Sequence, residues 1–240
     1  MKRIFATLLA LTLALSLTAC GGKSDSGSSA PAETPAETPA ESTGSWAPDG
    51  PVTMIVSYKA GNGTDQTARI LAQYAEKYIG QTIVIDNVDG GSGSIGWSKL
   101  ADADADDMTI GFLNLPNFNS SIVNELGIYT VDDFKAICNH VTETSIVVVR
   151  ADEDRFTTLG ELGYYDQWLG SSRCIAASAG VSDDVIAFYE AAFKAAMEDP
   201  DYLEAASSFM TDYKDAADTA ALIEQQQTFT EGLDDAFWGN

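Results

Sequence analysis

The chain has 240 residues, with 36 acidic and 13 basic side chains and a formal net charge of −23 at pH 7. So acidic a chain is a poor candidate for binding nucleic acid, because that affinity rests on Lys and Arg at phosphates. Its length suits one large domain or two small ones.

The first 19 residues have the three parts of a secretory signal. Two basic residues precede an apolar run from 5 to 18, and Ala19 supplies a small residue at the cleavage position. The run is too short for a membrane-spanning helix, which needs about 20 residues. Cys20 follows directly, an arrangement similar to the bacterial lipobox. We therefore expect a signal peptide at 1–19, a lipid on Cys20 and an extracytoplasmic protein anchored to the bacterial cell membrane.

Residues 20–45 have the composition of a tether. A Gly/Ser patch is followed by Pro-Ala-Glu-Thr repeats, with almost no large apolar side chain before Trp46. Such a segment cannot bury enough surface to offset its ordering entropy, and its prolines favour an extended spacer. We expect a disordered tether here and a folded part at 46–240.

Strands and helices alternate in the first half of the folded part. Short apolar, β-branched runs predict strands at 51–57, 82–85, 108–113, 134–140 and 145–149. Helical spacing predicts helices at 65–78, from the second glycine-rich turn to about 103, and at 116–125. Thr64 is the expected N-cap of the first helix and Gly80 its C-terminal stop. This order predicts an α/β fold of the periplasmic-binding-protein kind, with a mostly parallel sheet flanked by helices.

The pattern changes beyond residue 163. A strand is predicted at 171–177, and apolar residues then recur every four positions from Val181 to Met197, which indicates an amphipathic helix with Ser182 as N-cap. Pro200 ends this helix. Two further helices are predicted at 202–210 and 216–230.

Two glycine-rich turns, at 58–64 and 89–96, each follow a strand and open a helix. Free N–H groups and the positive end of the helix dipole make such a turn a site for anions. One turn alone is better explained as a plain tight turn. Two turns on neighbouring strands converge at the carboxyl edge of the sheet, where open α/β sheets bind ligands, so the pair favours an anion site. The G-x-G-x-x-G match at 91–96 is weak by itself.

These turns also carry a family resemblance. Residues 51–65, followed by Ala68 and Arg69, resemble the first loop of the tripartite tricarboxylate transporter receptors, the Bug-type periplasmic binding proteins. Residues 87–96 resemble their second loop. Further matches lie at 132–134, 158–162, 170–173 and 199–203. The resemblance covers most of residues 50–205.

In that family the two loops bind small carboxylates, largely through backbone amides and ordered water. The resemblance implies the following ligand-binding residues: Tyr58, Ala60, Gly61, Asn62, Gly63, Asp65, Ser92, Gly93 and Ser94. Ionised Asp65 repels a carboxylate, so we expect it to cap the helix, fix water or meet the amino group of a ligand. Asn62 replaces the usual glycine and Val88-Asp89 replaces Arg-Pro, which disfavours a tricarboxylate.

The family has two α/β domains that close over the ligand. Two domains of about 100–150 residues each do not fit comfortably into 46–240. We therefore expect an α/β ligand-binding domain 1 at 46–157, a junction or remnant of domain 2 at 158–177, and C-terminal helices at 178–240 that pack on domain 1. Most of the second domain is expected to be missing, by a deletion near 157–162.

The resulting prediction is a lipid-anchored solute-binding receptor for a small carboxylate or amino-acid-like solute. Its expected partner is the membrane permease of a tripartite transporter, and no cofactor and no nucleic acid are expected. With one domain missing, ligand binding is expected to be weak or lost. The alternative is a surface lipoprotein that binds a protein partner through the sheet face exposed by the deletion.

A hydrolytic enzyme is the less favoured alternative. His140 is the single histidine, and a structural role is favoured over a catalytic one with Cys138. The acidic runs 102–107 and 152–154 lack the glycine and terminal Glu of an EF-hand loop, which favours solvated turns. Cys138 and Cys174 fall in predicted strands, where free thiols and a disulfide remain equally open. We predict no catalytic and no metal-binding residues.

Overall fold

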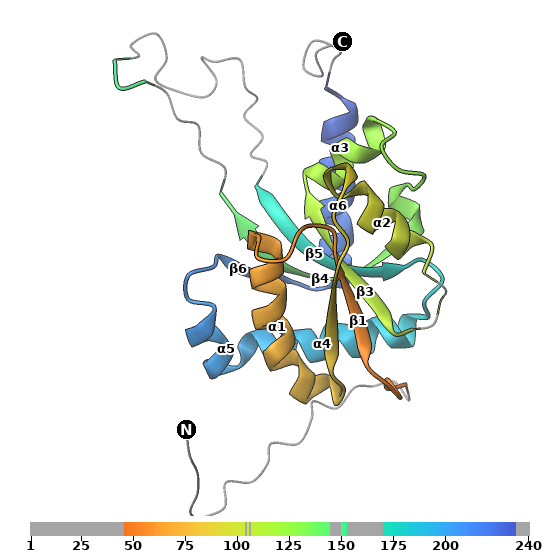
Figure 1. The fold of residues 1–240 in the computed structure, drawn as a ribbon, viewed down its shortest axis with the longest axis vertical. Helices are drawn as coiled ribbons and strands as arrows, with labels where there is room; N and C mark the ends of the chain where they lie inside the picture. The colour runs from red at the N-terminus through yellow and green to blue at the C-terminus, as the bar shows by residue number, and fades with distance from the viewer. Residues whose placement is uncertain (1–45, 104, 106, 145–149, 153–169, 234–240) are drawn as a thin grey trace, which may run out of the picture. The chain divides into compact units, whose positions relative to one another are not determined.

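The computed structural model of the protein describes residues 46–103, 105, 107–144, 150–152 and 170–233. These form one six-stranded sheet with the strand order β2-β1-β3-β5-β4-β6, with helices on both faces (Figure 1). The predicted signal, the tether and the strand at 145–149 lie outside the described residues. Among the described helices, none is long and apolar enough to cross a membrane.

The first half of the chain follows the predicted strand–helix alternation. Its elements are β1 (Val52–Val56), α1 (Gly63–Ile79), β2 (Ile83–Asn87), the short 3-10 turn η1 (Gly91–Gly93), α2 (Ser94–Ala101) and β3 (Thr109–Leu115). Strand β1 pairs in parallel with β2 and with β3. The carboxyl ends of these three strands therefore lie at one edge of the sheet.

The second half departs from a parallel sheet. Its elements are α3 (Asn117–Val123), η2 (Val131–Asp133), β4 (Phe134–Glu143), β5 (Ser171–Ser178), α4 (Asp183–Glu198), α5 (Pro200–Ala205), β6 (Thr211–Lys214) and α6 (Ala216–Glu231). Strand β5 lies between β3 and β4 and is antiparallel to both, and β6 is antiparallel to β4. The α/β class is confirmed, but the expectation of a mostly parallel sheet is wrong. A buried strand has the same apolar sequence pattern whether it is parallel or antiparallel to its neighbours, so the sequence did not indicate that β5 is antiparallel.

Strand β6 was not predicted. The helix expected at 202–210 ends at Ala205, and Thr211–Lys214 then pairs with β4 at the edge of the sheet. Asp199 caps α5 by accepting a hydrogen bond from the Asp201 N–H, and Pro200 occupies the first helical position, where its missing N–H costs nothing.

The N-cap of α1 lies two residues earlier than expected. Asn62, and not Thr64, is the N-cap, because its side chain accepts from the Asp65 N–H at 2.8 Å. Gly80 ends the helix with φ of 76°, as predicted. Ser182 precedes α4 as expected, although its side chain makes no capping hydrogen bond.

The two faces of the sheet carry separate hydrophobic clusters. On β1, alternate residues Val52, Met54 and Val56 pack with α1 and α4, while Ile55 packs with Trp97 of α2 on the other face. Phe118 of α3 and Ile223 of α6 belong to the second cluster, and both also line a cavity.

His140 has the structural role favoured from the sequence. It is fully buried in β4, its Nε2 lies 2.6 Å from the hydroxyl of Tyr202, and its ring packs against Phe112. Burial, aided by the charge of Arg173, lowers the pKa of His140 to about 3. Cys138 and Cys174 are buried free thiols, not a disulfide.

Acid should destabilise the fold through His140. An unfolded histidine has a pKa near 6.5, so between pH 6.5 and 3 the unfolded chain binds a proton that the folded chain excludes. The free energy of unfolding should therefore fall as the pH is lowered through this window, by up to about 1.4 kcal/mol per pH unit. Urea titrations between pH 6.5 and 5 should show this slope in the wild type and its loss in His140→Gln. An equal slope in both proteins would contradict the assignment.

Candidate functional site

The two glycine-rich loops lie together at the carboxyl edge of β1 and β2. The Val88 N–H donates to the carbonyl of Val56 at 2.9 Å. A Cβ on Gly96 would come within 2.8 Å of the Ser57 backbone, so α2 starts in direct contact with the end of β1. The predicted convergence of the loops is confirmed.

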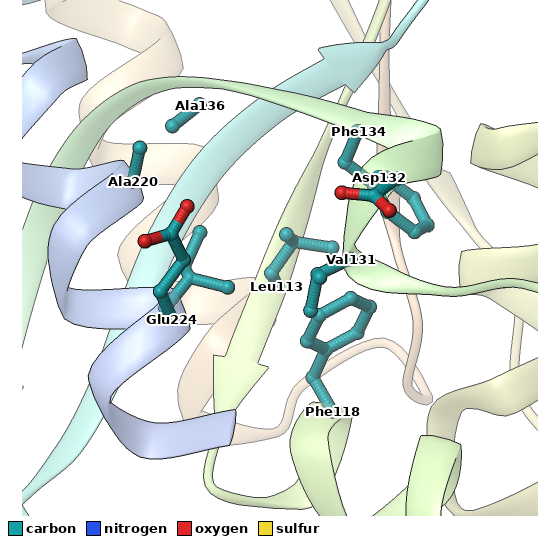
Figure 2. Close-up of a pocket in the computed structure, with 9 residues that line it drawn as sticks. Leu113, Phe118, Val131, Asp132, Phe134, Ala136, Ala220 and Glu224 are labelled. Atoms are coloured by element: carbon teal, nitrogen blue, oxygen red, sulfur yellow. The ribbon is translucent and has the colours of Figure 1, made fainter. Parts of the chain in front are cut away.

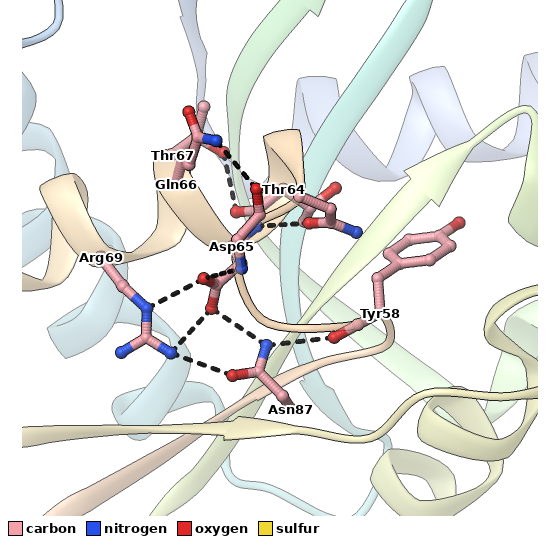
Figure 3. A network of polar contacts seen from close by, with 9 residues as sticks. Tyr58, Thr64, Asp65, Gln66, Thr67, Arg69 and Asn87 are labelled. Carbon is pink, nitrogen blue, oxygen red and sulfur yellow. Dashed lines mark hydrogen bonds and ion pairs between the residues drawn. The ribbon is translucent and has the colours of Figure 1, made fainter.

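Asp65 organises the first loop. Its carboxylate accepts from the Gly61 N–H at 2.7 Å, from Arg69 Nε at 3.0 Å and from Asn87 Nδ2 at 2.9 Å. Asn87 ends β2, and its Nδ2 also donates to the carbonyl of Tyr58 at 3.0 Å (Figure 3). One carboxylate thus ties the first loop, the first turn of α1 and the second strand to each other.

Asp65 does not face a ligand. It is 2% exposed and each of its oxygens already accepts from the protein. Burial alone raises its pKa, but the hydrogen bonds from Arg69, the Gly61 N–H and Asn87 outweigh burial, so the pKa of Asp65 is lowered. Of the three expected roles, the geometry supports fixing the loop and not a contact with a ligand's amino group.

The second loop depends on the close packing of Gly93 against Trp97. Gly93 has φ of 107°, and a Cβ there would meet the ring of Trp97 at 2.5 Å, so only glycine fits. Ser92 is exposed with φ of 56°, in the left-handed region, whereas Ser94 is buried at the start of α2. The indole N–H of Trp97 donates to the Phe112 carbonyl at 2.9 Å, which fixes α2 on β3.

The acidic residue of the second loop is paired. Asp89 lies 3.6 Å from Lys59 of the first loop, and both side chains are substantially exposed. Such an exposed pair adds little stability. It does place the positive charge of Lys59 beside Asp89, the carboxylate that was expected to disfavour an anion.

The start of α1 offers free hydrogen-bond donors. Among the described residues, the backbone N–H groups of Gly63 and Thr64 have no hydrogen-bond partner. Ala60, Gly61 and Gly63 are exposed. These donors lie at the positive end of the dipole of a 17-residue helix.

Tyr58 borders these donors. It is half-buried, its hydroxyl accepts from Asn117 Nδ2 at 3.3 Å, and its ring packs edge-on against Trp97. Burial raises the pKa of Tyr58, so its hydroxyl stays protonated at neutral pH and can serve as a donor.

Two polar residues at this edge were not predicted from the sequence. Arg173 of β5 is 9% exposed, and its Nη2 lies 3.5 Å from where a Cβ of Gly63 would sit. Asn114 of β3 is its register partner and donates to Thr64 Oγ1 at 2.8 Å. The sequence did contain one signal for Arg173: it is a charged residue in a strand, 171–178, whose other residues are small or apolar.

A cavity of about 190 Å³ lies elsewhere, between β3, β4, α3 and α6 (Figure 2). Its floor is apolar, and Asp132 and Glu224 are its charged lining residues. None of the nine predicted ligand-binding residues lines it. Two carboxylates without a basic residue make this cavity unsuitable for an anion.

The described residues contain no group of three His, Cys, Asp or Glu side chains that could hold a metal ion. Burial raises the pKa of Cys174 to about 12 and also raises that of Cys138, so neither thiol is a reactive nucleophile.

Solved structures that superpose on this α/β fold include a TctC solute-binding protein and the periplasmic binding protein BugD. A TctC solute-binding protein from Polaromonas superposes with a TM-score of 0.69 at 16% identity, over 77% of this chain and 98% of that chain. MatC from Rhodopseudomonas palustris, solved with bound malate, gives 0.65 at 15% identity, over 77% and 98%. An R. palustris protein with adipate gives 0.59 at 15% identity, over 77% and 96%.

The resemblance to Bug-type receptors is confirmed at the level of fold: the structural neighbours are Bug/TctC-type periplasmic solute-binding proteins. No protein-family model matches the chain. A UPF0065 protein from the TAR-I ttuE-ttuC' intergenic region of Agrobacterium vitis is 30% identical over 104 residues, 42% of this chain and 30% of that protein. Protein BugT of Bordetella pertussis is 38% identical over 63 residues, 26% of this chain and 19% of that protein. The chain matches about a third or less of the length of these relatives.

Replacing Asp65 should destabilise the fold, because this residue connects the first loop, α1 and β2. Asp65→Asn removes the charge from three hydrogen bonds, so we expect the free energy of unfolding to fall by about 1.5–3 kcal/mol. Asp183→Asn is the matched control, because Asp183 is exposed and pairs with Lys135 at the surface; its loss should be much smaller, because water screens an exposed pair. Urea denaturation at pH 7 measures both. Equal losses would show that Asp65 has no special role.

Proposed function

We propose that the protein is an extracytoplasmic solute-binding receptor for a small carboxylate. The observation that carries this proposal is the pair of unpartnered N–H groups of Gly63 and Thr64 at the start of α1, beside the second glycine-rich loop. The fold neighbours include proteins solved with malate and with adipate, both small carboxylates, which supports the same ligand class here.

The chemistry of this edge suits a carboxylate. Hydrogen bonds from backbone N–H groups to an ionised acceptor are stronger than those between neutral groups. The dipole of α1 adds a favourable potential for a negative charge at its N-terminus. The predicted loop residues Tyr58, Gly63 and Ser92 would line the ligand in this proposal, whereas Asp65 acts behind them.

We further propose that most of a second ligand-closing domain is absent. The described residues form a single sheet, and β4 and β5, which residues 144–170 connect, lie side by side in it. These two relatives are longer than this chain, because the same matched stretch is a larger share of this chain than of theirs, whereas this chain spans 98% of the solved TctC protein. A ligand held by one lobe stays open to water on its other side, and solute sites normally bury most of the ligand.

Calorimetric titration with malate, adipate, citrate and glutamate tests both proposals. We expect heat of binding for at least one carboxylate, with a dissociation constant of about 1 mM because the site is open on one side. Micromolar affinity would contradict the loss of the second domain. The absence of binding to every carboxylate tested would contradict the receptor function itself.

The proposed location depends on the N-terminal sequence. Cys20 would carry the lipid, residues 20–45 would separate the receptor from the membrane, and the membrane permease of a tripartite transporter would receive the solute. The periplasmic solute-binding neighbours support an extracytoplasmic location.

Lipidation predicts a simple fractionation result. The wild-type protein should sediment with membranes and incorporate an alkyne-bearing fatty acid, whereas Cys20→Ser should do neither because it lacks the acceptor thiol. Cys138→Ser is the matched control and should keep the label, since Cys138 is buried in the sheet. A labelled, membrane-bound Cys20→Ser protein would contradict the anchor.

A further inference from the structure

Arg173 brings a buried positive charge to the edge where the two loops meet. In the sheet it lies opposite Asn114 of β3, and side chains of directly opposed residues lie on the same face. Asn114 donates to Thr64 in the first turn of α1, so this face is the one under the start of α1. The Nη2 atom of Arg173 accordingly lies beside Gly63. The guanidinium and the free N–H groups of Gly63 and Thr64 therefore border the same place.

Among the described residues, the hydrogen-bond partner of the guanidinium is Glu143. Glu143, the last residue of β4, accepts from Nη1 at 3.2 Å and from Nη2 at 2.7 Å. The Nε atom is buried without a hydrogen-bond partner among the described residues. Because Nε is covered, the edge formed by Nη1 and Nη2 is the one that a solute can reach, and Glu143 occupies it.

Glu143 can leave this position at low cost. Its side chain is 42% exposed, whereas that of Arg173 is 11% exposed. A carboxylate at a strand end can turn into water and be solvated, but a buried guanidinium without a counter-charge is expensive. An incoming carboxylate would replace Glu143 with a group of the same charge and geometry.

We infer that Arg173 is the charged anchor for a carboxylate of the solute, and that Glu143 occupies this anchor until the solute displaces it. The inference rests on the proposed receptor function and adds its specificity-determining residue. It explains how this edge tolerates Asp89: the selective charge comes from β5, behind the first loop, and not from the second loop.

Calorimetry on the full chain in detergent micelles, with malate as the probe, tests the inference. Arg173→Gln should weaken malate binding about tenfold or more, because a charge-assisted bidentate contact is lost. Glu143→Gln should tighten it about threefold to tenfold, because the competing carboxylate is gone. Arg150→Gln and Asp152→Asn are the matched controls: they change the net charge equally in an exposed pair outside the site, and should leave affinity unchanged.

Malate binding by Arg173→Gln as tight as by Arg150→Gln would overturn the anchor. Weaker malate binding by Glu143→Gln would overturn the proposed competition between Glu143 and the solute. If Glu143→Gln weakened the binding of aspartate but not of malate, Glu143 would be a contact for an ammonium group of the solute. If circular dichroism shows that Arg173→Gln does not fold, the test rests on the malate affinities of Glu143→Gln and Asp152→Asn. Tighter binding by Glu143→Gln than by Asp152→Asn supports the inference, and equal affinities contradict it. A wild-type chain that binds no carboxylate contradicts the receptor function instead, which separates the two failures.

Discussion

The buried carboxylate of Asp65 is the interaction on which the two loops depend. It accepts from the Gly61 N–H, from Arg69 and from Asn87, and so connects the first loop, α1 and the end of β2. Removing one partner would leave a buried charge incompletely solvated, which costs far more than an ordinary surface contact contributes. The Gly61 N–H donates to Asp65, whereas the N–H groups of Gly63 and Thr64 have no hydrogen-bond partner among the described residues. The loop that Asp65 stabilises therefore also carries free donors.

The charged side chains at this edge of the sheet differ in how deeply they are buried. Asp65 and Arg69 neutralise each other behind the first loop, and Lys59 and Asp89 do so at its exposed rim. Arg173 differs, because its counter-ion within the described part of the chain is a half-exposed residue at the end of a strand. Screening by water makes the rim pair weak, whereas the buried guanidinium acts through a medium of lower effective dielectric. The net acidity of the whole chain therefore does not decide which ions this edge attracts.

Much of the fold follows from the sequence because its signals are local. Apolar runs bounded by glycine-rich turns located β1, α1, β2 and β3, and Gly80 marked the end of α1. The reversal of β5 depends on which strands it pairs with, and this is not encoded within 171–178. Thr64 and Asn62 are both good caps, and tertiary contacts decided between them, since Thr64 Oγ1 accepts from Asn114. Arg173 was missed for the same reason: it is distant in sequence from the loops it lies behind.

The pair of Arg173 and Glu143 also bears on the connection between β4 and β5. Glu143 ends β4 and Arg173 lies near the start of β5, so their ion pair holds together the two ends of the 144–170 connection. Two strands whose ends are already joined by pairing and by a charge-assisted contact can accept a connection of almost any length, because loop-closure entropy grows slowly with length. A deletion there would therefore leave the sheet intact. Under the proposed competition, a solute that displaces Glu143 would release this contact between the ends of β4 and β5.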